Sequence, residues 1–211
     1  MAYVLGFFAA DGYITVNKRG GQFWCIQITD KKLLEEIKNV IQAEHAISER
    51  KGSRGTHSLY RLQIGSIEMC DDLRRLGFSE RKTKNISVPC VPKEYFFDFV
   101  RGYFDGDGNV WSGNIHKERA TSHVTIRIMF TSCSLEFLRG LQKIIGSFGI
   151  EGGSLYKAKG NYARLQFSAK AALKLYDYMY NQCSSSKRNG LFLQRKKDVF
   201  EKYCAIASLR S

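Results

Sequence analysis

Hydrophobic and polar residues follow two alternating patterns along the chain. Strict alternation with aromatic and β-branched residues predicts strands at 13–19, 22–29, 109–113 and 123–131. Apolar residues at three- and four-residue spacings predict amphipathic helices at 31–42 and 134–148. A second strand pair follows each helix and ends in related phrases, YRLQI at 60–64 and ARLQF at 163–167, and helical segments at 67–78 and 170–180 come next.

The same order of elements occurs twice. Each copy opens with a short apolar helix ending in Asp-Gly, VLGFFAADG at 4–12 and VRGYFDGDG at 100–108. The pattern is αββαββα in both halves, with one further helix at 190–208, and it predicts an α/β (α+β) fold built as an intramolecular dimer.

The two prolines of the chain, Pro89 and Pro92, mark a linker. Proline removes a backbone donor, so we expect neither a helix nor a central strand through 84–95. The predicted units are therefore an N-terminal repeat at 1–88, a linker at 89–95 and a C-terminal repeat at 96–211.

Composition narrows the class of protein. With 44% hydrophobic residues the chain can bury a core, and its net charge of +13, positive in both halves, favours a polyanionic partner such as nucleic acid. Six dispersed cysteines without a CxxC pair argue against a zinc ribbon or a disulfide framework. We expect no membrane span and, since no targeting segment is seen, an intracellular location in the cytoplasm or an organelle.

Small residues in the two opening helices predict a close helix pair. Gly6 and Ala10 are four positions apart, as are Gly102 and Gly106, so each pair lies on one helix face. If the copies pack there, their C-terminal ends lie side by side. Gly12 and Gly108 are expected to end the helices in the left-handed conformation.

Asp11 and Asp107 are the last residues before those glycines. Carboxylates at two adjacent helix C-termini repel each other and the helix dipoles, and a divalent cation would reverse that penalty. Backbone carbonyls of Ala10 and Gly106 could add oxygen ligands, which favours Mg²⁺ over zinc and suits phosphodiester hydrolysis. The alternative is that Asp-Gly is only a common turn dipeptide.

These two helices and the repeat order resemble the LAGLIDADG homing endonucleases, specifically the single-chain members with two motifs. The resemblance implies a saddle of two antiparallel sheets on duplex DNA and assigns catalytic metal binding to Asp11 and Asp107. Ala9 stands where the first motif acid belongs, whereas the second copy keeps Asp105. In the family that acid is not the metal ligand, so the departure leaves the expected activity in place.

The family also carries a basic residue near each active centre. FSERKTKN at 78–85 points to Lys82, and FLQRKKDVF at 192–200 points to Lys196, with Lys187 as a fallback. Such lysines could stabilise charge on the phosphate or orient water; the alternative is a solvated basic surface. The resemblance offers Asp30 and Ser132 as weaker candidates for arranging water at the scissile phosphate.

Strand alternation also predicts an outward face that reads DNA. Arg, Gln and Asn match base edges in the major groove, although an ordinary solvated sheet face is the alternative. Because the outward residues of the two halves differ, the target should be asymmetric. The expected contacts are Tyr13, Thr15, Asn17, Arg19, Gln27, Arg61, Gln63, Asn109, Trp111, Arg127, Arg164 and Gln166.

The resulting hypothesis is a monomeric, site-specific endonuclease that cleaves both strands of double-stranded DNA with Mg²⁺ and leaves short 3′ overhangs. Mn²⁺ should substitute, and Ca²⁺ should support binding without cleavage. By the resemblance, its role would be the mobility of an intron or intein. Two alternatives stay open: the same scaffold without cleavage, as an intron maturase or transcription regulator, and a protein-interaction module with incidental charge.

Overall fold

Two copies of one αββαββα unit make up the protein. The computed structural model describes residues 1–51, 58–80, 85–115, 123–182 and 190–208. The N-terminal repeat consists of α1 (Ala2–Asp11), β1 (Gly12–Val16), β2 (Gln22–Ile28), α2 (Lys31–Val40), β3 (Ile47–Lys51), β4 (Ser58–Gly65) and α3 (Ile67–Arg75).

The C-terminal repeat has the same order and is extended at its end. After the 3-10 turn η1 (Lys93–Tyr95) come α5 (Phe96–Asp107), β5 (Gly108–Ile115), β6 (His123–Ser132), α6 (Leu135–Ser147), β7 (Ser154–Lys157), β8 (Ala163–Ser168), α7 (Lys170–Asp177), the π-helical turn η2 (Tyr178–Gln182) and α8 (Gln194–Ser208). The predicted repeat order is confirmed. The expectation of no helix at 84–95 was wrong by one turn, since η1 starts directly after Pro92.

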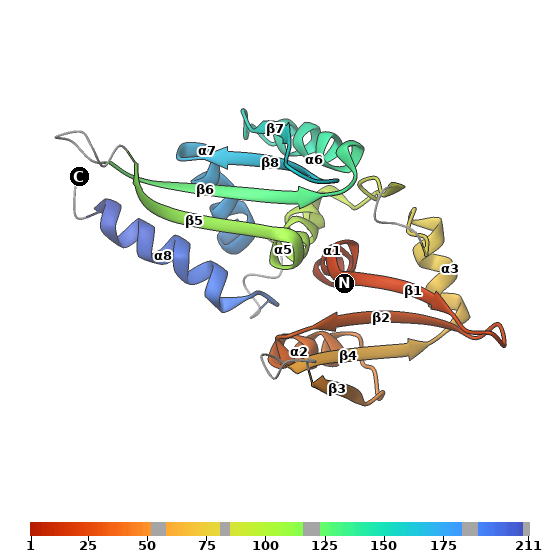
Figure 1. The fold of residues 1–211 in the computed structure, drawn as a ribbon. Coiled ribbons are helices and arrows are strands. Elements are labelled where there is room, and N and C mark those ends of the chain that lie inside the picture. Colours follow the sequence, from red (N-terminus) through yellow and green to blue (C-terminus); the bar gives the residue numbers. More distant parts are fainter. Residues whose placement is uncertain (52–57, 81–84, 116–122, 183–189, 209–211) are drawn as a thin grey trace.

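Each repeat forms a four-stranded antiparallel sheet, in the order β1-β2-β4-β3 and β5-β6-β8-β7. The registers match as well: Gly12 faces Ile26 and Gly108 faces Phe130. The two sheets extend to opposite sides of the central pair α1 and α5, which gives the saddle (Figure 1). The predicted fold class is therefore confirmed.

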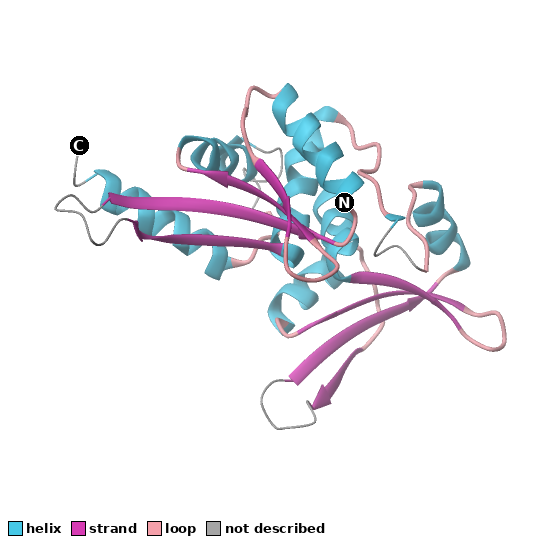
Figure 2. Cartoon of the chain, turned by 45° about the horizontal axis from the view of Figure 1, so that its top comes forward, coloured by secondary structure: helices cyan, strands magenta, loops and turns pink. Residues whose placement is uncertain are grey.

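Helices pack against one face of each sheet (Figure 2), and the hydrophobic core lies between the sheets and these helices. Trp24, Ile26 and Ile28 of β2 are buried, as are Ile126, Ile128 and Phe130 of β6. Because successive strand residues point to opposite faces, the residues between them face away from the helices. In the part of the chain that the structure describes, no helix is long and apolar enough to cross a membrane.

Strand β1 ends earlier than the alternation predicts. The side chain of Asn17 folds back, and its Oδ1 accepts hydrogen bonds from the backbone N–H groups of Arg19 at 2.9 Å and Gly21 at 2.8 Å. Gly20 takes a φ of 80°, which glycine adopts without strain. Asn17 and Arg19 therefore lie in the turn between β1 and β2 and not in a strand.

Candidate functional site

The central helices α1 and α5 touch backbone to backbone at their glycines. A Cβ on Gly6 would lie 2.0 Å from the carbonyl oxygen of Phe99, and one on Gly102 would lie 2.0 Å from that of Tyr3. One turn further on, a Cβ on Gly106 would meet the Ala10 methyl at 2.3 Å. The close contact predicted from these small residues is confirmed, and no larger side chain fits there.

Gly12 and Gly108 end the helices in a different way from the one expected. Their φ values of −81° and −96° are extended, so the left-handed ending was wrong. What these positions require is space. A Cβ on Gly12 would lie 2.0 Å from Cδ2 of Phe8, and one on Gly108 would lie 2.3 Å from Cδ2 of Phe104. The glycines let each chain turn directly from helix to strand over an aromatic ring.

The shared end of the helix pair carries Asp11, which is half-buried, and Asp107, which is exposed. Oδ2 of Asp11 lies 3.0 Å from the place a Cβ would take on Gly106, so this carboxylate reaches across to α5. Buried Tyr103 lies close to both acids: burial is the main cause that raises its pKa, and the charges of Asp107 and Asp11 raise it further. The two carboxylates therefore share one electrostatic environment.

Lys196 of α8 lies buried beneath this end. Its Nζ donates to the backbone carbonyls of Phe104 (2.5 Å), Asp105 (2.8 Å) and Gly108 (2.6 Å). Burial lowers the pKa of Lys196 to about 8, although Asp105, Asp11 and Asp107 act in the opposite direction. The ammonium thus places a positive charge at the negative end of the α5 dipole.

Asp105, on α5, is a buried carboxyl whose charge acts on Lys196. Its Oδ2 accepts hydrogen bonds from the hydroxyl of Tyr3 on α1 at 2.8 Å and from the backbone N–H of Leu193 at 2.9 Å. Burial raises the pKa of Asp105 to about 6, while those hydrogen bonds and the charges of Lys196 and Arg101 lower it. The motif acid therefore connects α1, α5 and the start of α8.

Arg101, on the same helix, fixes the path of the chain toward α8. Its guanidinium is buried, pairs with Asp98 at 2.8 Å and donates to the carbonyl oxygens of Met179 and Leu191 at 2.5 and 2.9 Å. The equivalent positions of α1 are Leu5 and Ala9. At these two positions α5 has polar side chains where α1 has apolar ones, so the two halves of the centre differ in sequence here.

The donor set at the helix ends fits a hard divalent cation. Among the described residues no group of three His, Cys, Asp or Glu could hold a metal, and the site offers two carboxylates beside helix-terminal backbone. Magnesium characteristically takes one or two carboxylates and completes its shell with water and substrate phosphate oxygens. Asp11 and Asp107 would be the residues that hold it, while carbonyl ligands from Ala10 and Gly106 stay a prediction.

The twelve residues predicted for the outward face all lie on the exposed or half-buried side. Pairing places Gln27 opposite Arg61, and Trp111 opposite Arg127, whose guanidinium carbon lies 5.6 Å from the indole ring. The remaining outward residues are Tyr13, Thr15, Gln63, Asn109, Arg164 and Gln166 in the strands, with Asn17 and Arg19 in the turn.

Tyr156 on β7 was not among the predicted outward residues; it is 38% exposed, and its hydroxyl donates to Oε1 of Gln166 at 3.4 Å. The register of β7 against β8 could have indicated it, but that strand has only four residues. Arg61 hydrogen-bonds Tyr13, which joins two of the predicted contacts.

The other residues predicted near the active centre are either outside the described residues or in helix caps and their surroundings. Lys82 and the fallback Lys187 lie outside the described residues. Asp30 caps α2, with its Oδ1 accepting from Leu33 N–H at 3.0 Å. Its structural counterpart is Ser134, the cap of α6, whereas Ser132 is buried and accepts from the N–H of Ser134. The predicted equivalence of Asp30 and Ser132 was therefore wrong, because the residue equivalent to Asp30 is Ser134, two positions later.

Comparison with known proteins extends these observations. The family model described as a LAGLIDADG-like domain matches residues 1–77 and 94–179. A protein of Thermococcus kodakarensis named as a probable translation initiation factor IF-2 is 32% identical over 153 residues, covering 70% of this chain and 12% of that protein. A protein of the same name from Methanocaldococcus jannaschii is 35% identical over 88 residues, 40% of this chain and 7% of that protein. The chain thus spans about an eighth or less of these relatives.

Solved structures share the fold at low sequence identity. A crystal structure of the meganuclease I-SmaMI bound to uncleavable DNA superposes with a TM-score of 0.66 at 15% identity, covering 99% of this chain and 89% of that one. The meganuclease I-AabMI bound to uncleaved DNA gives 0.63 at 13% identity, with 99% and 90% covered. The homing endonuclease I-LtrWI bound to target DNA gives 0.62 at 15% identity, with 99% and 89% covered.

Proposed function

The chain belongs to the LAGLIDADG-like family, and on this premise we propose that it is a site-specific endonuclease that binds a long asymmetric duplex and hydrolyses one phosphodiester in each strand. The observation that supports this proposal most strongly is the helix pair α1 and α5, whose glycine contacts bring Asp11 and Asp107 to the same end of the pair, at the centre of the molecule. One carboxylate from each repeat suits two scissile phosphates on opposite strands.

Asp11 and Asp107 would hold the divalent cation, proposed to be Mg²⁺, that polarises the phosphate and lowers the pKa of a water when bound. The protein supplies the position: the helix contacts fix both acids, and Gly12 and Gly108 leave room for the turn from helix to sheet. Lys196 balances the negative charge behind α5. We place Lys82 in the same role for the first repeat, and we propose short 3′ overhangs as the product.

The outward faces of the two sheets are proposed to lie in the major groove on both sides of the cleavage position. A strand of ten residues such as β6 spans roughly 33 Å, which is comparable to about ten base pairs. The N-terminal face presents Gln27, Arg61 and Gln63, and the C-terminal face presents Trp111 and Arg127. This difference supports an asymmetric target bound by a monomer.

The curated relatives support a proposal about the biological role. Two proteins named as probable translation initiation factors contain a matching segment that is only 12% and 7% of their length. We propose that the chain is an endonuclease element embedded in a longer protein, as in an intein, and that its role is the mobility of that element. The activity of an initiation factor is not carried over to it.

Cleavage of a random duplex library tests the proposal. The chain is incubated with the library and Mg²⁺, and the cut ends are sequenced; we expect one asymmetric consensus with paired breaks on the two strands. Ca²⁺ in place of Mg²⁺ should give binding without cut ends, and Mn²⁺ should restore cutting. Enrichment of a consensus by binding with no cut ends in any metal would support the non-cleaving alternative, and the absence of any enrichment would contradict DNA recognition.

A further inference from the structure

The third residue after the glycine that ends each motif helix occupies an equivalent place in the two sheets. Thr15 of β1 lies directly opposite Phe23 of β2, and Trp111 of β5 lies directly opposite Arg127 of β6. Since the sheets share strand order and register, both cross-strand pairs are the same number of residues from the paired helix ends. A duplex bound across both sheets would therefore meet the two pairs at positions equally far from its centre.

In the C-terminal sheet this pair consists of an indole ring and a guanidinium. The guanidinium carbon of Arg127 lies 5.6 Å from the centre of the Trp111 ring. A Cβ on Gly113 would lie 2.6 Å from Cζ2 of Trp111, so the indole extends along β5 over the glycine two residues further on. Ile126 and Ile128, on either side of Arg127, are buried in the core, so Arg127 projects from the outward face beside the indole.

The hydrogen-bonding edge of Arg127 is available for a base. A guanidinium has five N–H donors in a rigid planar fork. Among the residues that the structure describes, none accepts a hydrogen bond from this side chain. Guanine presents two acceptors, O6 and N7, in the major groove, and arginine pairs with both at once. Because the indole restricts the arginine, less conformational freedom is lost when those bonds form.

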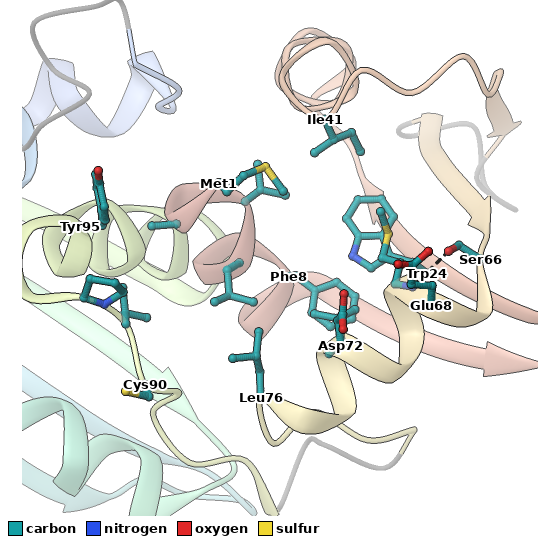
Figure 3. Close-up of a pocket in the computed structure, with 17 residues that line it drawn as sticks. Met1, Phe8, Trp24, Ile41, Ser66, Glu68, Asp72, Leu76, Cys90 and Tyr95 are labelled. Atoms are coloured by element: carbon teal, nitrogen blue, oxygen red, sulfur yellow. Dashed lines mark hydrogen bonds between the residues drawn. The ribbon is translucent and has the colours of Figure 1, made fainter.

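The N-terminal sheet carries an apolar ring at the equivalent place. Trp24, the neighbour of Phe23, points to the helix side and stacks on Phe8 with ring centroids 5.8 Å apart (Figure 3), so Phe23 points outward. The Phe23 ring lies over Gly65, its partner on β4, where a Cβ would come within 3.4 Å of Cε1. A phenyl ring forms no hydrogen bond to guanine, and what it can contact in the major groove is the methyl group of thymine.

We propose that these two pairs set the base preference at two positions equally far from the centre of the target. Arg127, restricted by Trp111, selects a G·C pair in one half-site, and Phe23 selects a T·A pair in the other. This assignment rests on the proposed function, because it requires the outward faces to lie in the major groove. It names the bases at one place where the two half-sites differ.

Selection by binding tests the assignment. Wild type and each variant bind a library of random duplexes in Ca²⁺, and the retained DNA is sequenced, so that base preference is measured without cleavage. For wild type we expect a G·C preference of about 5- to 150-fold at one position and a T·A preference at the position equally far from the centre on the other side. Arg127→Gln should change G·C to A·T at the first position only, because glutamine pairs with adenine N6 and N7.

Two further variants test the aromatic residues. Trp111→Ala should lower the G·C preference several-fold without changing the other positions, and Phe23→Ala should remove the T·A preference alone. Arg139→Gln, on α6 at the helix side, is the matched control and should leave the whole consensus unchanged. Thermal unfolding midpoints close to that of wild type show that each variant is folded.

An unchanged G·C preference in Arg127→Gln or Trp111→Ala would overturn the assignment and leave the proposed function in place. So would an equal loss of affinity for all sequences, or responses to Arg127→Gln and Phe23→Ala at unequal distances from the centre. A wild type that enriches no sequence would contradict the proposed function itself, and the assignment with it.

Discussion

At the centre of the molecule, the space between α1 and α5 limits which residues fit, in addition to the chemistry of the acids. Gly6 and Gly102 place backbone atoms of α1 and α5 in direct contact, and Gly106 leaves room for Ala10 and the Asp11 carboxylate. Both acids project from these helices, so the distance between the two carboxylates depends on the absence of side chains at the glycines between the helices.

Adding a single methyl group at Gly6 tests whether the contact between α1 and α5 requires glycine there. Gly6→Ala would place a carbon 2.0 Å from the carbonyl oxygen of Phe99, so the helices must separate, and we expect a loss of about 1–3 kcal/mol or more in the free energy of unfolding. The matched control is Gly146→Ala in α6, where nothing lies within 4 Å of the added carbon. There we expect a gain of about 0.5–1 kcal/mol. Equal effects in chemical denaturation would contradict the packing argument.

Asp105 provides a pH-dependent test of the same contact. Its pKa is raised from 3.8 to about 6 in the folded chain, mainly by burial. Between these values the folded chain binds more protons than the unfolded chain, so this group makes the free energy of unfolding fall as the pH rises through the window from about 4 to 6. In Asp105→Asn that component is absent. Urea titrations should show wild type losing stability relative to the variant across the window, and parallel curves would argue against a buried carboxyl.

At the scale of elements, three buried polar side chains join α5 to α8 and to the segment before it. Arg101, Asp105 and Lys196 connect the second motif helix to the segment that begins α8, through hydrogen bonds to Met179, Leu191, Leu193 and the end of α5. In α1 the corresponding side chains are Leu5 and Ala9. The Tyr3 hydroxyl donates a hydrogen bond from α1 to Asp105 on α5.

Truncating Arg101 tests whether these contacts stabilise the fold. Arg101 and Asp98 form a buried pair three positions apart, and Arg75 and Asp72 form an exposed pair with the same spacing. Arg101→Ala removes the guanidinium that pairs with Asp98 and donates to two carbonyl oxygens, and we expect a cost of about 3–5 kcal/mol. Arg75→Ala should cost about 0–1 kcal/mol. Thermal unfolding of the two variants distinguishes them; a similar small change in both would show that Arg101 does not fasten α8.

The element order and the helix pair were predictable from the sequence because they depend on local periodicity and small residues. Details that depend on distant contacts were not. Nothing near Gly12 indicates that the ring of Phe8 excludes a side chain there, and the turn at Asn17 depends on a side chain competing with the strand. Lys196 was predicted from the family resemblance, but its burial under α5 was not. That burial depends on contacts such as its hydrogen bond to the carbonyl of Asp105, a residue 91 positions away in the sequence.

At the scale of the whole molecule, positive charge and the outward sheet faces determine how DNA would be bound. Arg61, Arg127 and Arg164 lie on these faces, whereas Arg139 lies on α6, on the helix side. Changing the three face arginines to glutamine should weaken binding to duplex DNA and reduce the slope of log affinity against log salt by up to about one per lost phosphate contact. Arg139→Gln should change neither quantity in fluorescence anisotropy titrations. A comparable loss in Arg139→Gln would show that the charge acts without regard to position.

The central claim is that Asp11 and Asp107 perform the cleavage together. Its most direct test is a plasmid that carries the target recovered from the library, incubated with Mg²⁺ and wild type, Asp11→Asn or Asp107→Asn, with binding followed on the same DNA in Ca²⁺. The account predicts linear plasmid from wild type, none from either variant, and affinities for the target that stay close to wild type. Linear plasmid from a variant at the wild-type rate would contradict it, as would a variant that no longer binds the target.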